Sequence, residues 1–193
     1  KLIYDGEEHV SIASLDEDIF KQTIVINGVS KAYAMTGWRI GYAAGPIEVI
    51  KAMSSLQSQV ASGSNSIAQY AAEEALRSPK GPEEIERMHK AYDERRRHIV
   101  SRLNAIDGLK CVMPKGAFYV MVDMSALIGK HLGDRKIGGS MDFADMLLEN
   151  ANVALTPGTA FCAEGYCRIS YATSMEQIDK GVDRIEHFVN SLV

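Results

Sequence analysis

Hydrophobic residues occur along this chain in two spacings, and the change from one to the other predicts a protein of mixed α/β class. Continuous apolar runs are typical of strands, which we expect at 2–4, 23–26, 38–44, 109–113, 117–122, 153–156 and 167–171. Apolar residues at helical spacing predict a single turn at 14–20 and helices at 47–60, 66–76, 81–108, 141–150 and from Ser174 onward. The uninterrupted run Ile24-Val25-Ile26 predicts a strand buried on both faces, as in a parallel sheet covered by helices.

The predicted helix that ends near Gly108 divides the chain. A helix of this length usually joins two bodies or crosses one. We therefore expect one body at 1–84, an interdomain helix at 85–108 and a small α/β domain at 109–193. Residues 1–6 have the pattern of a strand that enters an Asp-Gly turn, so we expect the chain to begin inside a domain.

Composition and charge narrow the function classes. The 193 residues are 46% hydrophobic, which suits a globular core, and the net charge of -4 argues against nucleic-acid binding because phosphate contacts need a basic face. No apolar run reaches the roughly 18 to 20 residues that a membrane helix needs. The histidines show no metal-ligand spacing, so no metal site is predicted. Cys111, Cys162 and Cys167 form an odd set without paired spacing, which predicts free thiols in a reducing, cytoplasmic compartment.

One basic run, Arg95-Arg96-Arg97-His98, lies on a helical pattern beside acidic residues. This mixture of charges predicts a solvated helix face. The alternative is an anion or partner site.

Lys31 is the first candidate for chemistry. It follows the apolar run at 24–26, and no acidic residue occurs between positions 19 and 47. An ammonium without a nearby carboxylate is expected to be partly desolvated there, which would make the amine a nucleophile for carbonyl carbons. The alternative is a surface lysine in a strand-to-helix turn, and spacing alone favours that alternative.

Residues 27–42 (Asn-Gly-Val-Ser-Lys-Ala-Tyr-Ala-Met-Thr-Gly-Trp-Arg-Ile-Gly-Tyr) favour the chemical interpretation, because they resemble the pyridoxal-phosphate lysine motif of class I aminotransferases. The likeness is greatest to the bacterial-type aspartate aminotransferases. It implies that Lys31 is the catalytic residue that carries pyridoxal phosphate and moves protons, that Arg39 binds the cofactor phosphate, and that Ser30 adds a hydroxyl donor. Some relatives have a serine where this chain has Gly28, so that part of the phosphate site differs here.

Two later stretches resemble the same family. Residues 153–161 and 165–172 are similar to the end of its small domain, and this likeness implies that Arg168 holds the substrate α-carboxylate. The alternative is an arginine on an outer strand face. The loop at 62–69 resembles one that reaches the phosphate of a neighbouring subunit, which implies a homodimer with Ser62 as a further cofactor contact. Residues 114–119 resemble a structural turn at the entrance of the small domain.

The resemblance implies the pyridoxal-phosphate-dependent transferase fold type I. Residues 1–84 would be the carboxyl-terminal part of a large, mixed-sheet cofactor domain, followed by the interdomain helix and the small domain. The implied function is transfer of an amino group between an amino acid, aspartate by overall likeness, and a 2-oxo acid. The alternatives are a sensing or dimerisation module of a regulator and a lyase on the same fold. In the family, the aspartate that pairs with the cofactor ring lies upstream of the matched region, so we expect this stretch alone not to complete the reaction.

Overall fold

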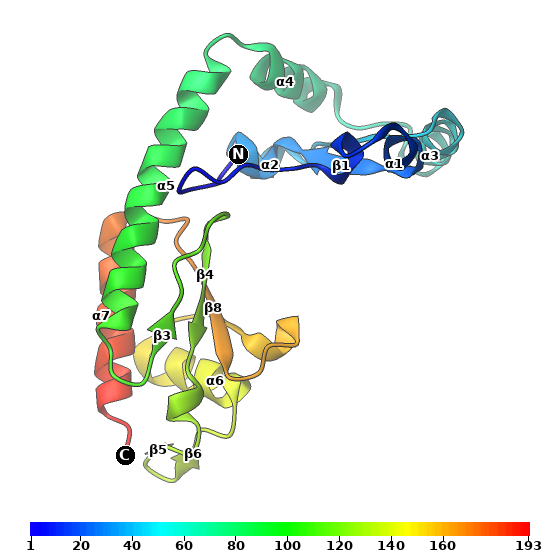
Figure 1. Ribbon diagram of the computed structural model, residues 1–193. Coiled ribbons are helices and arrows are strands. Elements are labelled where there is room, and N and C mark those ends of the chain that lie inside the picture. Colours follow the sequence, from blue (N-terminus) through cyan, green and yellow to red (C-terminus); the bar gives the residue numbers. More distant parts are fainter. The chain divides into compact units, whose positions relative to one another are not determined.

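The computed structural model describes residues 1–193 and separates them into two compact units (Figure 1). Unit 1 consists of Lys1 and Gly6–His89, and unit 2 consists of Leu2–Asp5 and Lys90–Val193. The long helix α5, Gly81–Asn104, contributes residues to both units. None of the helices is long and apolar enough to cross a membrane.

Unit 1 contains a two-stranded sheet and several helices. Its elements are η1 (Ile12–Ser14), α1 (Glu17–Gln22), β1 (Val25–Gly28), α2 (Val29–Ala32), η2 (Thr36–Trp38), β2 (Gly41–Ala44), α3 (Ile47–Ala61), α4 (Ser66–Arg77) and the start of α5. Its small core consists of Val29, Ile40, Ala68 and Ala72, with Tyr33 and Met35 packed against it. The helices predicted at 47–60 and 66–76 are confirmed.

The predicted environment of the first buried strand is wrong. β1 pairs antiparallel with β2, from Val25 opposite Ala44 to Gly28 opposite Gly41, and Ile26 is 77% exposed. An antiparallel ribbon of two strands has no second layer over this face, so an uninterrupted apolar run does not become buried. α3 likewise has no buried residue, although its sequence predicts an apolar face.

Unit 2 is built on an antiparallel sheet of order β3-β4-β8-β7. Its elements after α5 are β3 (Lys110–Cys111), β4 (Tyr119–Asp123), η3 (Ser125–Leu127), β5 (His131–Leu132), β6 (Arg135–Lys136), α6 (Ser140–Ala151), β7 (Thr156–Pro157), η4 (Gly158–Phe161), β8 (Tyr166–Ser170) and α7 (Met175–Asn190). The strand predicted at 153–156 is reduced to Thr156–Pro157. The strand predicted at 2–4 is only an isolated bridge between Ile3 and Gly116.

The core of unit 2 lies between one face of this sheet and its helices. Along β4 the buried residues Val120 and Val122 alternate with the half-buried Tyr119 and Met121, because successive side chains of a strand point to opposite faces. Ser174 is the N-cap of α7, where the sequence predicts the helix to start, and its hydroxyl accepts a hydrogen bond from the Gln177 amide. Figure 1 shows α7 beside the second half of α5, where the buried faces of both helices join the core.

Candidate functional site

Lys31 and Arg39 lie at the same end of the β1–β2 pair. β1 ends at Gly28, which is opposite Gly41, and the Val29 amide donates to the Ile40 carbonyl at 3.4 Å. Lys31 follows in the short helix α2, whereas Arg39 comes two positions before β2. A Cβ at Gly28 would lie 3.0 Å from the Ile40 carbonyl oxygen, so a serine at this position would require this close approach of the two strands to open.

The backbone of Arg39 adopts the left-handed conformation, with φ 56° and ψ 44°. This conformation costs a non-glycine residue about 1 kcal/mol, so the surrounding turn must stabilise it. The side chain is exposed, and Nη1 donates a hydrogen bond to the Thr36 carbonyl at 2.9 Å. The guanidinium is therefore anchored on one side by its own turn and keeps further donors for an anion.

Lys31 is exposed and Ser30 is half-buried. The partial desolvation expected at Lys31 is therefore not found in this chain. The reason is the same as for Ile26: the two-stranded ribbon carries no layer over this end. Ser62 caps the carboxyl end of α3, is exposed and has φ 57°. It lies on a different element from Lys31 and Arg39, and the structure gives no contact that brings it to them.

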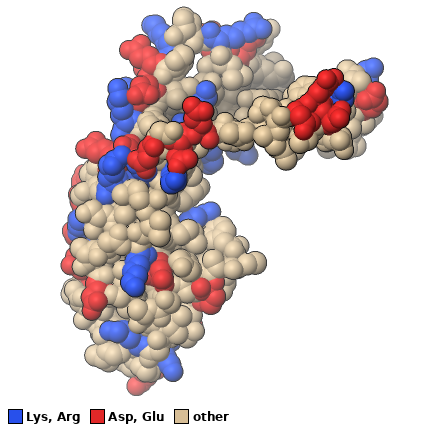
Figure 2. Space-filling model, viewed as in Figure 1, with Lys and Arg blue, Asp and Glu red and all other residues tan.

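The groups at this end of the ribbon fit a phosphorylated carbonyl compound. An amine, a permanently charged guanidinium and a hydroxyl come from Lys31, Arg39 and Ser30. On the face shown in Figure 2, basic and acidic side chains lie close to one another.

Arg168 lies in unit 2, on the sheet face opposite the core. It is paired across the sheet with Met121 of β4 and Thr156 of β7. Its Cζ atom lies 4.3 Å from the ring centroid of Tyr119 and 4.4 Å from that of Phe161. The guanidinium is thus enclosed by two aromatic rings, and no carboxylate of unit 2 forms an ion pair with it.

The turn that carries Phe161 depends on Gly158. A Cβ at this position would lie 1.9 Å from the Ala163 carbonyl oxygen and 2.4 Å from that of Tyr166. The turn closes with Cys162 in the left-handed conformation, where its amide donates to the Thr159 carbonyl at 3.2 Å. Only glycine allows η4 to approach β8 closely enough to place Phe161 against Arg168.

A buried arginine, Arg96, holds the first residues of the chain to unit 2. Its side chain is fully buried, and Nη1 and Nη2 donate to the two carboxylate oxygens of Asp5 at 2.7 Å each. Nε donates to Asp93 at 2.8 Å, and the guanidinium covers the Tyr4 ring at 4.3 Å. The prediction of a solvated face is therefore wrong for Arg96, whereas Arg97 beside it is 59% exposed. Helical spacing alone does not predict which of three adjacent arginines is buried, because the partner of Arg96, Asp5, is distant in sequence.

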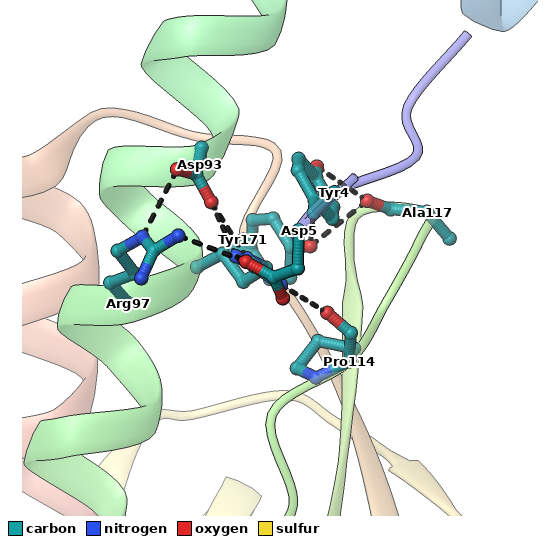
Figure 3. A network of polar contacts seen from close by, with 8 residues as sticks. Tyr4, Asp5, Asp93, Arg97, Pro114, Ala117 and Tyr171 are labelled. Atoms are coloured by element: carbon teal, nitrogen blue, oxygen red, sulfur yellow. Dashed lines mark hydrogen bonds and ion pairs between the residues drawn. The ribbon is translucent and has the colours of Figure 1, made fainter. Parts of the chain in front are cut away.

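Two tyrosine hydroxyls complete this cluster (Figure 3). Tyr4 and Tyr171 both donate to the Ala117 carbonyl, at 2.8 and 2.9 Å, and Ala117 has φ 63°. Burial raises the pKa of both tyrosines, whereas hydrogen bonding to Arg96 lowers the pKa of Asp5 to about 2. The two tyrosine hydroxyls therefore stay protonated as donors, and the Asp5 carboxylate stays ionised as an acceptor. Ala117, which accepts from both hydroxyls, lies just before β4.

The comparisons with known proteins establish the class of this chain. The family model for aminotransferase class I and II matches residues 2–185, and the chain belongs to that family. The predicted fold class is confirmed: the aspartate aminotransferase of Rhizobium meliloti superimposes with a TM-score of 0.94 at 43% identity, over 100% of this chain and 48% of that one. An aromatic aminotransferase from Pyrococcus horikoshii gives a TM-score of 0.87 at 41% identity, over 97% of this chain and 48% of its own.

Sequence relatives point in the same direction. The chain is 47% identical to the aspartate aminotransferase of Bacillus sp. strain YM-2 over 98% of its own length and 47% of the relative. It is 45% identical to that of Geobacillus stearothermophilus, over 99% of its length and 47% of the relative. The chain therefore spans about half the length of the curated relatives that it matches.

Proposed function

We propose that this chain is part of an aminotransferase that uses pyridoxal phosphate to move an amino group between an amino acid, aspartate in the first place, and a 2-oxo acid. The observation that carries the proposal is the 47% identity to an aspartate aminotransferase over 98% of the chain. The retained amine and guanidinium at the end of the β1–β2 pair support it.

Pyridoxal phosphate, when bound, supplies an electron sink that weakens the bond between the substrate Cα and its hydrogen. Arg39 would bind the phosphate through donors that its turn leaves available, and the Ser30 hydroxyl would donate a further hydrogen bond. The Lys31 amine would hold the cofactor. Once the substrate has displaced it, the amine would act as a general base that takes the proton from the substrate Cα, and then as a general acid that returns the proton to a different atom.

Arg168 would bind the α-carboxylate of the substrate. A guanidinium donates two parallel hydrogen bonds to a carboxylate, which fixes the orientation of the attached Cα and hence the direction of its hydrogen. The absence of a carboxylate partner in unit 2 supports this role, because an arginine already paired would have to exchange its partner.

We also propose that the protein acts as a homodimer in the cytoplasm, with Ser62 reaching the phosphate of the neighbouring subunit. Large apolar side chains of α3 are exposed, among them Leu56 at 66% and Val60 at 74%, as on a surface that other protein covers. Three free cysteines suit a reducing compartment.

The function is tested by incubating the full-length protein that contains this chain with pyridoxal phosphate, aspartate and 2-oxoglutarate and following the formation of oxaloacetate. Borohydride reduction and mass spectrometry then locate the attached cofactor. We expect Lys31→Ala to abolish both the activity and the label, and Lys51→Ala, at an exposed lysine of α3, to preserve both. A label that persists in Lys31→Ala would exclude Lys31 as the attachment site, and a labelled protein that transfers no amino group from any amino acid would refute the proposed activity.

A further inference from the structure

Tyr119 and Phe161 enclose the Arg168 guanidinium, although neither ring has a role in the function proposed above. Tyr119 is opposite Ser170 in the register of β4 and β8, and Arg168 is opposite Met121. Tyr119 and Arg168 are therefore diagonal neighbours on one face of the sheet, a separation that long side chains can bridge. Phe161 approaches from η4, which is a separate element.

The two rings restrict how Arg168 can be used. An arginine side chain has several rotatable bonds and would otherwise sample many orientations. Fixing one of them when a ligand binds costs conformational entropy. Rings whose centroids lie 4.3 and 4.4 Å from Cζ limit the orientations that the guanidinium can adopt. A carboxylate binds to the N–H donors in the plane of the guanidinium, so a guanidinium held by both rings presents these donors in a fixed direction before the ligand arrives.

Tyr119 is itself held in place. Its ring packs on Phe118 with centroids 4.5 Å apart, and the Phe118 carbonyl accepts a hydrogen bond from the Tyr171 amide at 3.0 Å. Immediately before it, the Ala117 carbonyl accepts the hydroxyls of Tyr4 and Tyr171 (Figure 3). The buried cluster around Arg96 thus fixes the start of the strand from which Tyr119 projects.

We propose that Tyr119 and Phe161 are positioning residues that hold the Arg168 guanidinium in the orientation that binds the substrate carboxylate. They act through Arg168 and do not touch the reacting atoms. The inference rests on the proposed function, in which Arg168 is the carboxylate ligand.

The experiment uses the full-length protein that contains this chain, loaded with pyridoxal phosphate, and measures maleate binding by calorimetry together with kcat and KM for aspartate. Maleate is a dicarboxylate without an amino group, and the aspartate aminotransferase of Thermus thermophilus has been solved with maleate. We expect Tyr119→Leu and Phe161→Leu each to weaken maleate binding by roughly 2- to 30-fold, the range of a cation–π contact. KM for aspartate should rise by more than kcat falls.

Conservative and control variants separate positioning from general stability. Tyr119→Phe and Phe161→Tyr keep a ring at each position and should retain the original maleate affinity. Tyr166→Leu is the matched control, because Tyr166 lies on the same strand and face as Arg168 and is 40% exposed, close to the 41% of Phe161. It should leave maleate binding unchanged. If a leucine variant does not fold, as judged by circular dichroism, methionine at that position replaces the ring with similar volume.

A double-mutant cycle decides whether the rings act through Arg168. In an Arg168→Leu background, removing either ring should have no further effect on maleate binding. An equal loss in both backgrounds would overturn the inference. If Arg168→Leu weakens binding and the ring variants do not, the inference fails and the role of Arg168 stands. If Arg168→Leu itself changes nothing, the carboxylate role proposed for Arg168 fails as well.

Discussion

Arg96 and Asp5 form a bidentate ion pair across 91 positions of sequence, with both contacts at 2.7 Å and the arginine fully buried. An arginine removed from water in this way requires its partners, because a buried charge that loses them is strongly unfavourable. Asp5 and Asp93 both form ion pairs with Arg96, and Asp5 also forms one with Arg97.

Arg96→Met should destabilise the protein severely. It leaves Asp5 and Asp93 without their main partner, for which we expect a loss of roughly 3 kcal/mol in the free energy of unfolding. Arg97→Met on the next residue of α5 is the matched control, and because Arg97 is 59% exposed the loss there should stay below about 1 kcal/mol. Urea unfolding of both variants at pH 7 measures the difference. Equal losses would show that burial of Arg96 has no special cost.

Asp5 should make stability depend on acid. Hydrogen bonding to Arg96 lowers its pKa from 3.8 to about 2 in the folded protein. A carboxyl group with a lowered folded pKa contributes stability that is complete above its unfolded pKa and disappears as the pH falls through the folded pKa. The stability advantage of the original protein over Asp5→Asn should therefore shrink between about pH 4 and pH 2. Urea unfolding over that range tests this, with the exposed Asp18→Asn as the control, and a constant difference would contradict it.

Gly158→Ala should disrupt the turn that carries Phe161. The new Cβ would collide with the carbonyl oxygens of Ala163 and Tyr166, neither of which can move without shifting the backbone. We expect a loss of at least about 2 kcal/mol, with weaker maleate binding because Phe161 is displaced. Gly181→Ala on α7 is the contrasting variant: nothing lies within 4 Å of its added Cβ, and it should stabilise the helix by up to about 1 kcal/mol. Thermal unfolding compares the two, and similar shifts in Tm would refute the steric explanation.

The three thiols should differ in reactivity. Cys162 is exposed, whereas burial raises the pKa of Cys111 to about 11 and that of Cys167 to about 12. A thiol must ionise to react, so at pH 8 a disulfide reagent should label Cys162 quickly and the other two only after unfolding. Mass spectrometry of the labelled peptides measures this. Rapid labelling of Cys111 in the folded protein would show that unit 2 opens readily.

Local patterns predicted the helices better than the strands. The helices at 47–61 and 66–77 follow from spacing and end signals within their own segments. The bounds of the strand at 153–156 could not be predicted in this way. Only Thr156 and Pro157 are paired with β8, and this pairing depends on residues that are distant in the sequence. Ile26 shows a related limit: an apolar run gives strand propensity but does not say what covers the strand.

Some residues of the candidate site could be predicted from local sequence, and others could not. Lys31, Arg39 and Arg168 were predicted because they stand in recognisable motifs, and their roles remain predictions. Tyr119 and Phe161 were missed because their relation to Arg168 depends on strand register and on the turn at η4. Tyr119 lies two positions from Met121, the residue opposite Arg168. This relation can be read from the sequence only after β4 and β8 have been paired in the correct register.

Unit 2 is discontinuous, since Leu2–Asp5 belongs to it although the whole of Gly6–His89 intervenes. A protein made of residues 90–193 would lack the Asp5 carboxylate and the Tyr4 ring and hydroxyl, so Arg96 would lose two of its contacts and Ala117 one of its donors. Such a fragment would keep the binding site for its own missing segment: a synthetic peptide of residues 1–6 should bind to it and restore its stability by complementation, and Asp5→Asn in the peptide should weaken that binding.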